Sequence, residues 1–174
     1  WGRILDYESR KKGLGVFPAD YRRYIYDELG ANLKPLELQA AMGRVQLRRL
    51  QEFKTKRKRN ADVLKKLLSE IEDKIILPFS SEKSEVCWYT FPITLKKGKR
   101  AKVLEALDKG NIEWRPILAG NIARQPAFID EIIVRDKLNN ADQLLNNSFW
   151  VSVHPTHSVQ AMEFVASTII KALD

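Results

Sequence analysis

The sequence predicts an α/β fold of the α+β kind, in which long helices pack on a small, mainly antiparallel sheet. Two observations predict it. Apolar residues recur at alternating steps of four and three along residues 36–71, which is helical spacing. From residue 75 onward the elements alternate as strand, helix, strand, helices, strand, helix. This order suits a small antiparallel or mixed sheet with helices covering one face.

Length and composition limit the class of protein. The chain has 174 residues, 44% of them hydrophobic, which suits one domain of ordinary size. No run of about 18 apolar residues occurs, so we expect no membrane span. The opening residues do not resemble a signal peptide, and the missing initiator Met suggests a fragment or a processed piece.

The single cysteine, Cys87, excludes an internal disulfide and favours a reducing, cytoplasmic compartment. It precedes Trp88 in an apolar run, so we expect a packed core thiol. A nucleophilic role is the minor alternative, because no His is close in sequence.

The net charge of +8 belongs to one segment. Residues 44–66 hold ten Lys and Arg against Glu52 and Asp62, and the rest of the chain is neutral. We interpret this segment as a solvated helix face and expect no nucleic-acid partner. An acidic or phosphorylated partner, or a nucleic acid, is the alternative.

Residues 1–29 are polar and aromatic and predict a loop. Residues 30–47 predict a loop that runs into a helix. Pro35 suits a first helical turn, and the acid Glu37 suits the positive end of the helix dipole. From Leu36 the segment is apolar on almost every side, so we expect this helix to be buried.

The helical seam continues beyond this segment. It has a gap where Lys54 and Arg57 fall on seam positions, and it predicts two consecutive helices or one kinked helix. The apolar seam positions are Leu36, Ala40, Gly43, Leu47, Leu50, Ala61, Leu64, Leu68 and Ile71.

The second half alternates strands and helices. Composition predicts strands at 75–78, 86–95, 112–118 and 148–153, with Pro92 near an edge or bulge. Periodicity predicts helices at 100–109, 138–145 and 159–173, the first ending at Gly110. We expect a turn at 119–121 and an irregular or helical stretch at 122–133.

Common catalytic motifs are missing. The sequence contains no glycine-rich phosphate loop and no metal-ligand cluster of Cys and His. His154 and His157 flank a Pro-Thr pair at the end of a predicted strand. The two histidines could bind a metal ion, although no third ligand is evident. Alternatively, they cap the loop or are exposed to solvent.

Several motifs resemble the DegT-type, fold-type-I, PLP-dependent nucleotide-sugar aminotransferases and hexose 3-dehydratases. They cover the chain in order: WGR at 1–3, YDELGANLKPLELQAAMG at 26–43, FPI at 91–93, RPILAGNIARQPA at 115–127 and VH at 153–154. Single residues that match are Gln46, Leu47, Leu50, Phe53, Arg57, Asn60, Trp88, Ala141, Asp142 and Trp150. The 115–127 pattern leans toward the 3-dehydratases.

The resemblance implies that this chain is the C-terminal portion of such an enzyme, a small-domain fragment of the PLP transferase fold. Residues 1–50 would end the large cofactor domain and supply a dimer-contact helix, and residues 51–174 would form the small domain. The Schiff-base residue would precede Trp1, so the resemblance implies no catalytic residue here and an inactive isolated chain. The complete enzyme would be a cytoplasmic homodimer in deoxysugar or lipopolysaccharide biosynthesis.

The resemblance also assigns binding residues. Asn32 would bond the PLP phosphate of the other subunit, and Lys34 would add positive charge there. Arg115, Asn121, Arg124 and His154 would face the nucleotide sugar, since guanidinium groups can hold a diphosphate bidentately. Two residues depart from the family pattern: Trp114 replaces a small Thr, and Pro155 replaces a second histidine.

Alternatives from the residues themselves remain. Asn32 also suits a left-handed turn, and Arg124 suits a surface ion pair. The chain could instead be a non-catalytic dimerisation module derived from the same fold. A nucleic-acid-binding helix at 44–66 is disfavoured, because its seam is apolar and no aromatic residues interleave its charges.

Overall fold

The structure, a computed structural model, describes residues 36–118, 120–124 and 132–174. Its internal contacts divide the chain into two units between Arg48 and Arg49. The predicted loop at 1–29 and the corner around Asn32 lie outside the described residues. None of the described helices is long and apolar enough to cross a membrane.

A single long helix, α2 (Glu37–Leu68), replaces the two consecutive helices that the seam allowed. A short 3-10 helix, η2 (Ser69–Ile71), follows it directly. The side-chain amide oxygen of Gln39 accepts from the backbone N–H of Leu36 at 2.8 Å, which satisfies one of the free donors at the helix start.

The sequence predicted that the first turns of α2 are buried, but they are exposed. Their large apolar side chains are 48–69% exposed: Leu36, Leu38, Met42, Val45, Leu47 and Leu50. The prediction is wrong for the single described chain because an apolar pattern shows that a surface needs a partner, and does not say whether the same chain supplies it. The seam residues Ala61, Leu64, Leu68 and Ile71 are buried as predicted.

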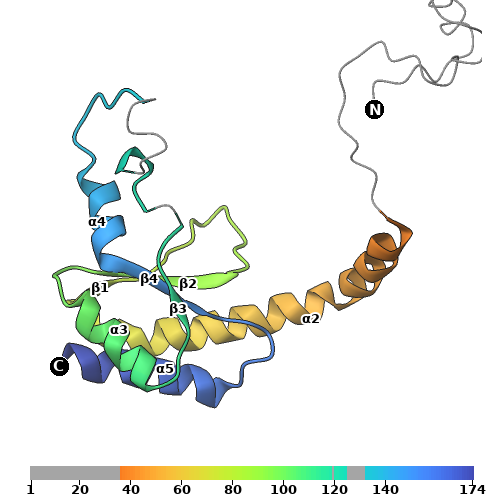
Figure 1. The fold of residues 1–174 in the computed structure, drawn as a ribbon. Helices are drawn as coiled ribbons and strands as arrows, with labels where there is room; N and C mark the ends of the chain where they lie inside the picture. The colour runs from red at the N-terminus through yellow and green to blue at the C-terminus, as the bar shows by residue number, and fades with distance from the viewer. Residues whose placement is uncertain (1–35, 119, 125–131) are drawn as a thin grey trace, which may run out of the picture. The chain divides into compact units, whose positions relative to one another are not determined.

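The second unit contains a four-stranded antiparallel sheet in the order β1-β2-β4-β3. Its strands are β1 (Ile75–Ile76), β2 (Thr90–Leu95), β3 (Trp114–Arg115) and β4 (Ser148–Ser152). The helices are α3 (Arg100–Lys109), α4 (Asn139–Asn147) and α5 (Val159–Leu173), with a 3-10 turn η3 (Ile122–Arg124). Figure 1 shows α3, α5 and the C-terminal half of α2 together on one side of the sheet, with α4 on the other.

The core lies between the sheet and these helices. Alternation along the strands sends Phe91, Ile93 and Leu95 of β2, and Phe149 and Val151 of β4, into the core, where each is at most 1% exposed. The helices contribute Val103, Leu104 and Leu107 from α3 and Met162, Val165, Ala166, Ile169 and Leu173 from α5. The predicted small antiparallel sheet is confirmed. The C-terminal half of α2 and helices α3 and α5 cover one face as predicted, whereas α4 lies on the other side (Figure 1).

Pro92 lies inside β2, opposite Trp150 of β4, and is tolerated there because β1 is short. The backbone N–H of Lys96 donates to Lys74 on the β1 side. Since alternate residues of a strand direct their N–H groups to the same side, the nitrogen of Pro92 also faces that side. Strand β1 pairs only with Thr94 and Leu95. Pro92 is therefore locally at an edge, as predicted.

All four strands are shorter than composition predicted, β2 and β3 by the most residues. The segment 86–89 is not part of β2, because β4 offers partners only to residues 90–94. Cys87 therefore stands in the loop before β2, and it is exposed. The expectation of a packed core thiol is wrong for this reason. Likewise, β3 is limited to Trp114 and Arg115, since β4 pairs with those two residues.

Candidate functional site

The face of the sheet opposite the core carries a cavity of about 840 Å³. Cross-strand register places Trp150 of β4 between Pro92 of β2 and Arg115 of β3 on this face, with Thr90 opposite Ser152 in the next row. The lining residues are Arg57, Tyr89, Thr90, Glu113, Arg115, Pro116, Ile117, Leu118, Trp150, Ser152 and His154. Apolar walls with a few polar groups are typical of small-molecule sites.

Arg115 and His154 are the two predicted substrate residues that the structure brings together in this cavity. The Arg115 side chain is exposed and its Nε donates to a carboxylate oxygen of Glu113 at 3.0 Å. This pairing orients the guanidinium but leaves most of it accessible. Its charge and fork geometry suit a phosphate or diphosphate.

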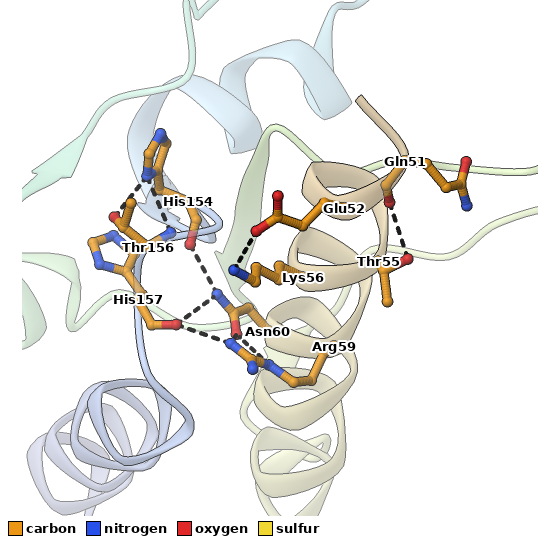
Figure 2. A network of polar contacts seen from close by, with 9 residues as sticks. All are labelled: Gln51, Glu52, Thr55, Lys56, Arg59, Asn60, His154, Thr156 and His157. Atoms are coloured by element: carbon orange, nitrogen blue, oxygen red, sulfur yellow. Dashed lines mark hydrogen bonds and ion pairs between the residues drawn. The ribbon is translucent and has the colours of Figure 1, made fainter. Parts of the chain in front are cut away.

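The His154 imidazole is fixed by its own turn. Its Nδ1 lies 2.8 Å from Thr156 Oγ1 and 3.4 Å from the backbone nitrogen of Thr156 (Figure 2). A backbone N–H can only donate, so of the two neutral tautomers it favours the one that carries the proton on Nε2. Among the described residues Nε2 has no hydrogen-bond partner, and it is available as a donor to a ligand oxygen.

His157 shares this turn and behaves differently. Burial, and secondarily the charge of nearby His154, lower the pKa of His157 below its ordinary value. The two rings are 6.0 Å apart and His157 Nε2 lies 3.0 Å from Ser152 Oγ. No group of three metal-ligating side chains occurs among the described residues. Of the three interpretations of the pair, loop capping describes the hydrogen bonds of both rings.

Arg57 also lines the cavity, although the sequence predicted no binding role for it. It donates from Nη1 to the carbonyl oxygen of Tyr89 at 3.1 Å, and its guanidinium carbon lies 5.2 Å from the centre of the Tyr89 ring. The sequence did indicate that Arg57 faces the folded unit, because this residue interrupts the apolar seam. A cation at that position needs a polar or aromatic neighbour.

Asn121 and Arg124 form a separate cluster around Asp142 of α4. Asn121 is buried, donates to Asp142 Oδ1 at 2.8 Å and accepts from the backbone N–H of Ala123 at 3.0 Å. Arg124 donates to both carboxylate oxygens. Hydrogen bonds from Arg124 and then Asn121 lower the pKa of Asp142, and the Asp142 hydrogen bond raises the pKa of Arg124.

The turn before this cluster requires glycine. Gly120 has a φ of +56°, and a Cβ at this position would overlap the side chain of Leu145 in α4. Close approach of the turn to α4 brings Asn121 within reach of Asp142. Residues 119 and 125–131, which flank the cluster, lie outside the described residues.

The two departures from the family pattern have different consequences. Trp114 lies opposite Val151 in the β3–β4 ladder, so it faces the core, and its Nε1 donates to Asp108 at 2.8 Å. It does not fill the cavity. Pro155 is buried in the turn between the two histidines.

The remaining predicted site residues, Asn32 and Lys34, lie outside the described residues. They were the two assigned to the cofactor phosphate. The described residues therefore do not test the predicted cofactor contacts.

Comparison with known proteins identifies the family of this chain. The model of the DegT/DnrJ/EryC1/StrS aminotransferase family matches residues 7–170. The chain belongs to this family. Family membership confirms the resemblance seen in the motifs.

Two curated relatives are similar over most of this family member. The lipopolysaccharide biosynthesis protein RfbH of Salmonella typhimurium is 38% identical over 159 residues, covering 88% of this chain and 36% of the relative. The dTDP-4-dehydro-2,6-dideoxy-D-glucose 3-dehydratase of Saccharopolyspora spinosa is 33% identical over 184 residues, covering 97% and 39%. The chain spans well under half the length of these relatives.

A solved structure extends the likeness to three dimensions. It is a GDP-4-keto-6-deoxymannose-3-dehydratase with a trapped PLP-glutamate geminal diamine. The TM-score is 0.76 and the identity 25%, over 91% of this chain and 42% of that one. This family member therefore has the fold of one portion of a PLP-dependent enzyme. The structural neighbour itself binds PLP.

Proposed function

We propose that this chain is the C-terminal part of a PLP-dependent enzyme that acts on a nucleotide-linked 4-keto-6-deoxy sugar. The reaction would be 3-dehydration or transamination, in deoxysugar or lipopolysaccharide biosynthesis. The observation that carries the proposal is the cavity on the sheet face, where Arg115 and His154 converge in a member of this family. The names of the relatives support the same substrate class.

The chemistry of the cavity fits such a substrate. Arg115 would hold a diphosphate oxygen, and the Nε2 proton of His154 would bond a sugar oxygen. Trp150 and Tyr89 offer flat apolar surfaces to a sugar or a base. When bound, PLP supplies an electron sink for carbon chemistry on the sugar. Asn32 and Lys34 would contact its phosphate in the partner subunit.

We also propose that Asn121 and Arg124 lie beside the bound substrate. Arg124 would reach a substrate phosphate only by exchanging the Asp142 carboxylate for it. Asn121 would act chiefly by holding α4 and the turn at 120–124 in place, since its amide already bonds Asp142 and Ala123.

We further propose residues 1–50 as the end of the cofactor domain and a homodimer contact, and residues 51–174 as the small domain. The exposed apolar residues on the first turns of α2 support a partner surface. The same observation favours the second candidate function, a non-catalytic dimerisation module. Lys56 and Lys58 pair with acids one turn away on α2, which weakens the case for nucleic-acid binding.

Product analysis tests the proposal. The chain, and the full product of its gene, are each mixed with PLP and a GDP- or dTDP-linked 4-keto-6-deoxyhexose, and the sugar is analysed by mass spectrometry. We expect conversion only by the longer protein. Loss of the 3-hydroxyl would identify a dehydratase, and gain of an amino group an aminotransferase. Conversion by the isolated chain would contradict the fragment proposal, and no conversion by either would favour the dimerisation module.

A further inference from the structure

Asn60 is the buried polar residue of α2, with no exposed surface in the described structure. Its neighbours on the buried stripe, Ala61, Leu64 and Leu68, are apolar. An unpaired amide at such a position would destabilise the fold, so its partners indicate what it is for.

The Asn60 side-chain amide donates its hydrogen bonds to one turn and accepts hydrogen bonds from Arg59 (Figure 2). Its Nδ2 donates to the carbonyl oxygen of His154 at 2.9 Å and to that of His157 at 3.4 Å. Its Oδ1 accepts from Arg59 Nε at 3.1 Å and Nη2 at 2.9 Å. The same Arg59 Nη2 donates to His157 O at 3.0 Å. Nearly a hundred residues of sequence separate α2 from this turn.

The turn itself is a closed four-residue unit. The backbone N–H of His157 donates to His154 O at 3.0 Å, and Pro155 occupies the second position, where a fixed φ suits a turn. On the strand side, Ser152 Oγ accepts from the backbone N–H of His154 at 3.2 Å. Asn60 therefore holds both end carbonyls of a turn whose first residue lines the cavity.

We propose that Asn60 is a positioning residue for His154: by binding the two end carbonyls of the 154–157 turn, it sets where the His154 imidazole stands in the cavity. The consequence for substrate rests on the proposed function, whereas the positioning itself does not. Arg59 supports Asn60 by fixing the orientation of the amide, since Oδ1 must face the guanidinium and Nδ2 the carbonyls.

The test uses Asn60→Asp in the 174-residue chain. The carboxylate keeps the acceptor toward Arg59 and loses the donor toward the carbonyls. We expect amide exchange of His157 to accelerate by about 10-fold or more and the ring signals of His154 to shift in NMR spectra. Exchange in α3 should not change.

Two further variants keep the test decisive. Arg59→Gln alters an exposed residue and should give smaller changes of the same sign, even if Asn60→Asp folds poorly. Leu67→Ala, in the same helix and packed on the core, should lower the melting temperature without moving the His154 signals. Unchanged His154 and His157 signals in Asn60→Asp, or the same changes in Leu67→Ala, would overturn the proposal.

A kinetic measurement separates this proposal from the proposed function. In the complete enzyme, Asn60→Asp should raise KM for the nucleotide sugar by about 10-fold with a smaller effect on kcat. If the His154 signals shift in the chain and KM does not change, the positioning role stands and the assignment of His154 to substrate fails.

Discussion

Arg124 and Asp142 are joined by two hydrogen bonds, from Nε to Oδ1 at 3.1 Å and from Nη2 to Oδ2 at 2.9 Å. The same carboxylate accepts from the buried amide of Asn121. One acid on α4 thus holds two residues that the family resemblance assigns to the substrate. This pairing fixes the turn at 120–124 to α4.

Replacing Asn121 by Ala should lower the free energy of unfolding by about 1–3 kcal/mol, because it leaves the buried N–H of Ala123 without its acceptor. Urea denaturation measures the change. Asn146→Ala is the matched control: this exposed amide donates to the Asp142 carbonyl, and its loss should stay within about 0.5 kcal/mol. Equal effects of the two variants would argue that Asn121 does not fix the turn.

The His157 ring should make stability depend on pH. Because its pKa in the folded chain is below the ordinary value of 6.5, the unfolded chain binds more protons as the pH falls below that value. Stability is therefore fully present above pH 6.5 and declines as the pH falls from there toward the lowered pKa. Thermal melts between these limits should show a weaker decline in His157→Gln.

His154→Gln serves as the control for this pH dependence. It removes only the smaller, Coulombic cause of the His157 shift and leaves burial, the larger cause, in place. Most of the pH dependence should therefore persist in His154→Gln. A His157→Gln variant with the slope of the unmodified chain would show that other groups produce it.

A buried hydroxyl pair offers a stability test in the sheet. Thr94 Oγ1 and Ser148 Oγ lie 2.8 Å apart across the β2–β4 ladder, and both side chains are buried. Thr94→Val should cost about 1–2 kcal/mol of unfolding free energy, since the Ser148 hydroxyl loses its partner. The double variant Thr94→Val/Ser148→Ala should recover part of the loss. Simple additivity in this double-mutant cycle would contradict the pairing.

Removing the charge of Arg115 should weaken binding of the nucleotide sugar. We expect Arg115→Ala in the complete enzyme to raise KM by about 10- to 100-fold, the range for a lost charge-assisted hydrogen bond. Steady-state kinetics measures it. Lys97→Ala, an exposed cation in the turn before α3, is the matched control and should leave KM unchanged. An unaltered KM in Arg115→Ala would remove this residue from the proposed site.

The exposed apolar residues of α2 predict self-association. Met42→Glu places a charge among them and should shift the chain from dimer to monomer in analytical ultracentrifugation, because burying an unpaired carboxylate is unfavourable. Phe164→Glu makes the same change at an exposed apolar position of α5 and should leave the association state unaltered. A chain that is monomeric before any substitution would contradict the dimer proposal.

Much of the fold follows from local patterns. Helix α5 begins and ends where periodicity placed it, and Ser158 caps it by accepting from the backbone N–H of Ala161 at 3.1 Å. Helix α3 also matches. Strand limits were less accurate: the segment 86–95 has uniform strand composition, yet only Thr90–Leu95 forms β2. A strand extends only as far as its neighbours pair with it, and composition does not give that length.

The candidate site was predictable in kind and less so in arrangement. The family motifs identified Arg115 and His154, and the structure brings both to one cavity. The motifs did not show that Arg124 and Asn121 are already engaged by Asp142, because a contact between residues 18 and 21 positions apart leaves no periodic signal. Nor did they show Arg57 beside Tyr89, which depends on how α2 meets the loop before β2.

By itself, the sequence determined the family and helices α3 and α5, since these depend on residue type and spacing along one element. Only the tertiary structure decided which polar groups meet. The Asn60 amide reaches the carbonyl oxygens of His154 and His157 across nearly a hundred residues of sequence. Register likewise decided that Arg115 faces the cavity while Trp114 faces the core. Such contacts are set by how strands and helices pack against one another, and hydrogen bonds between distant residues form only once that packing exists.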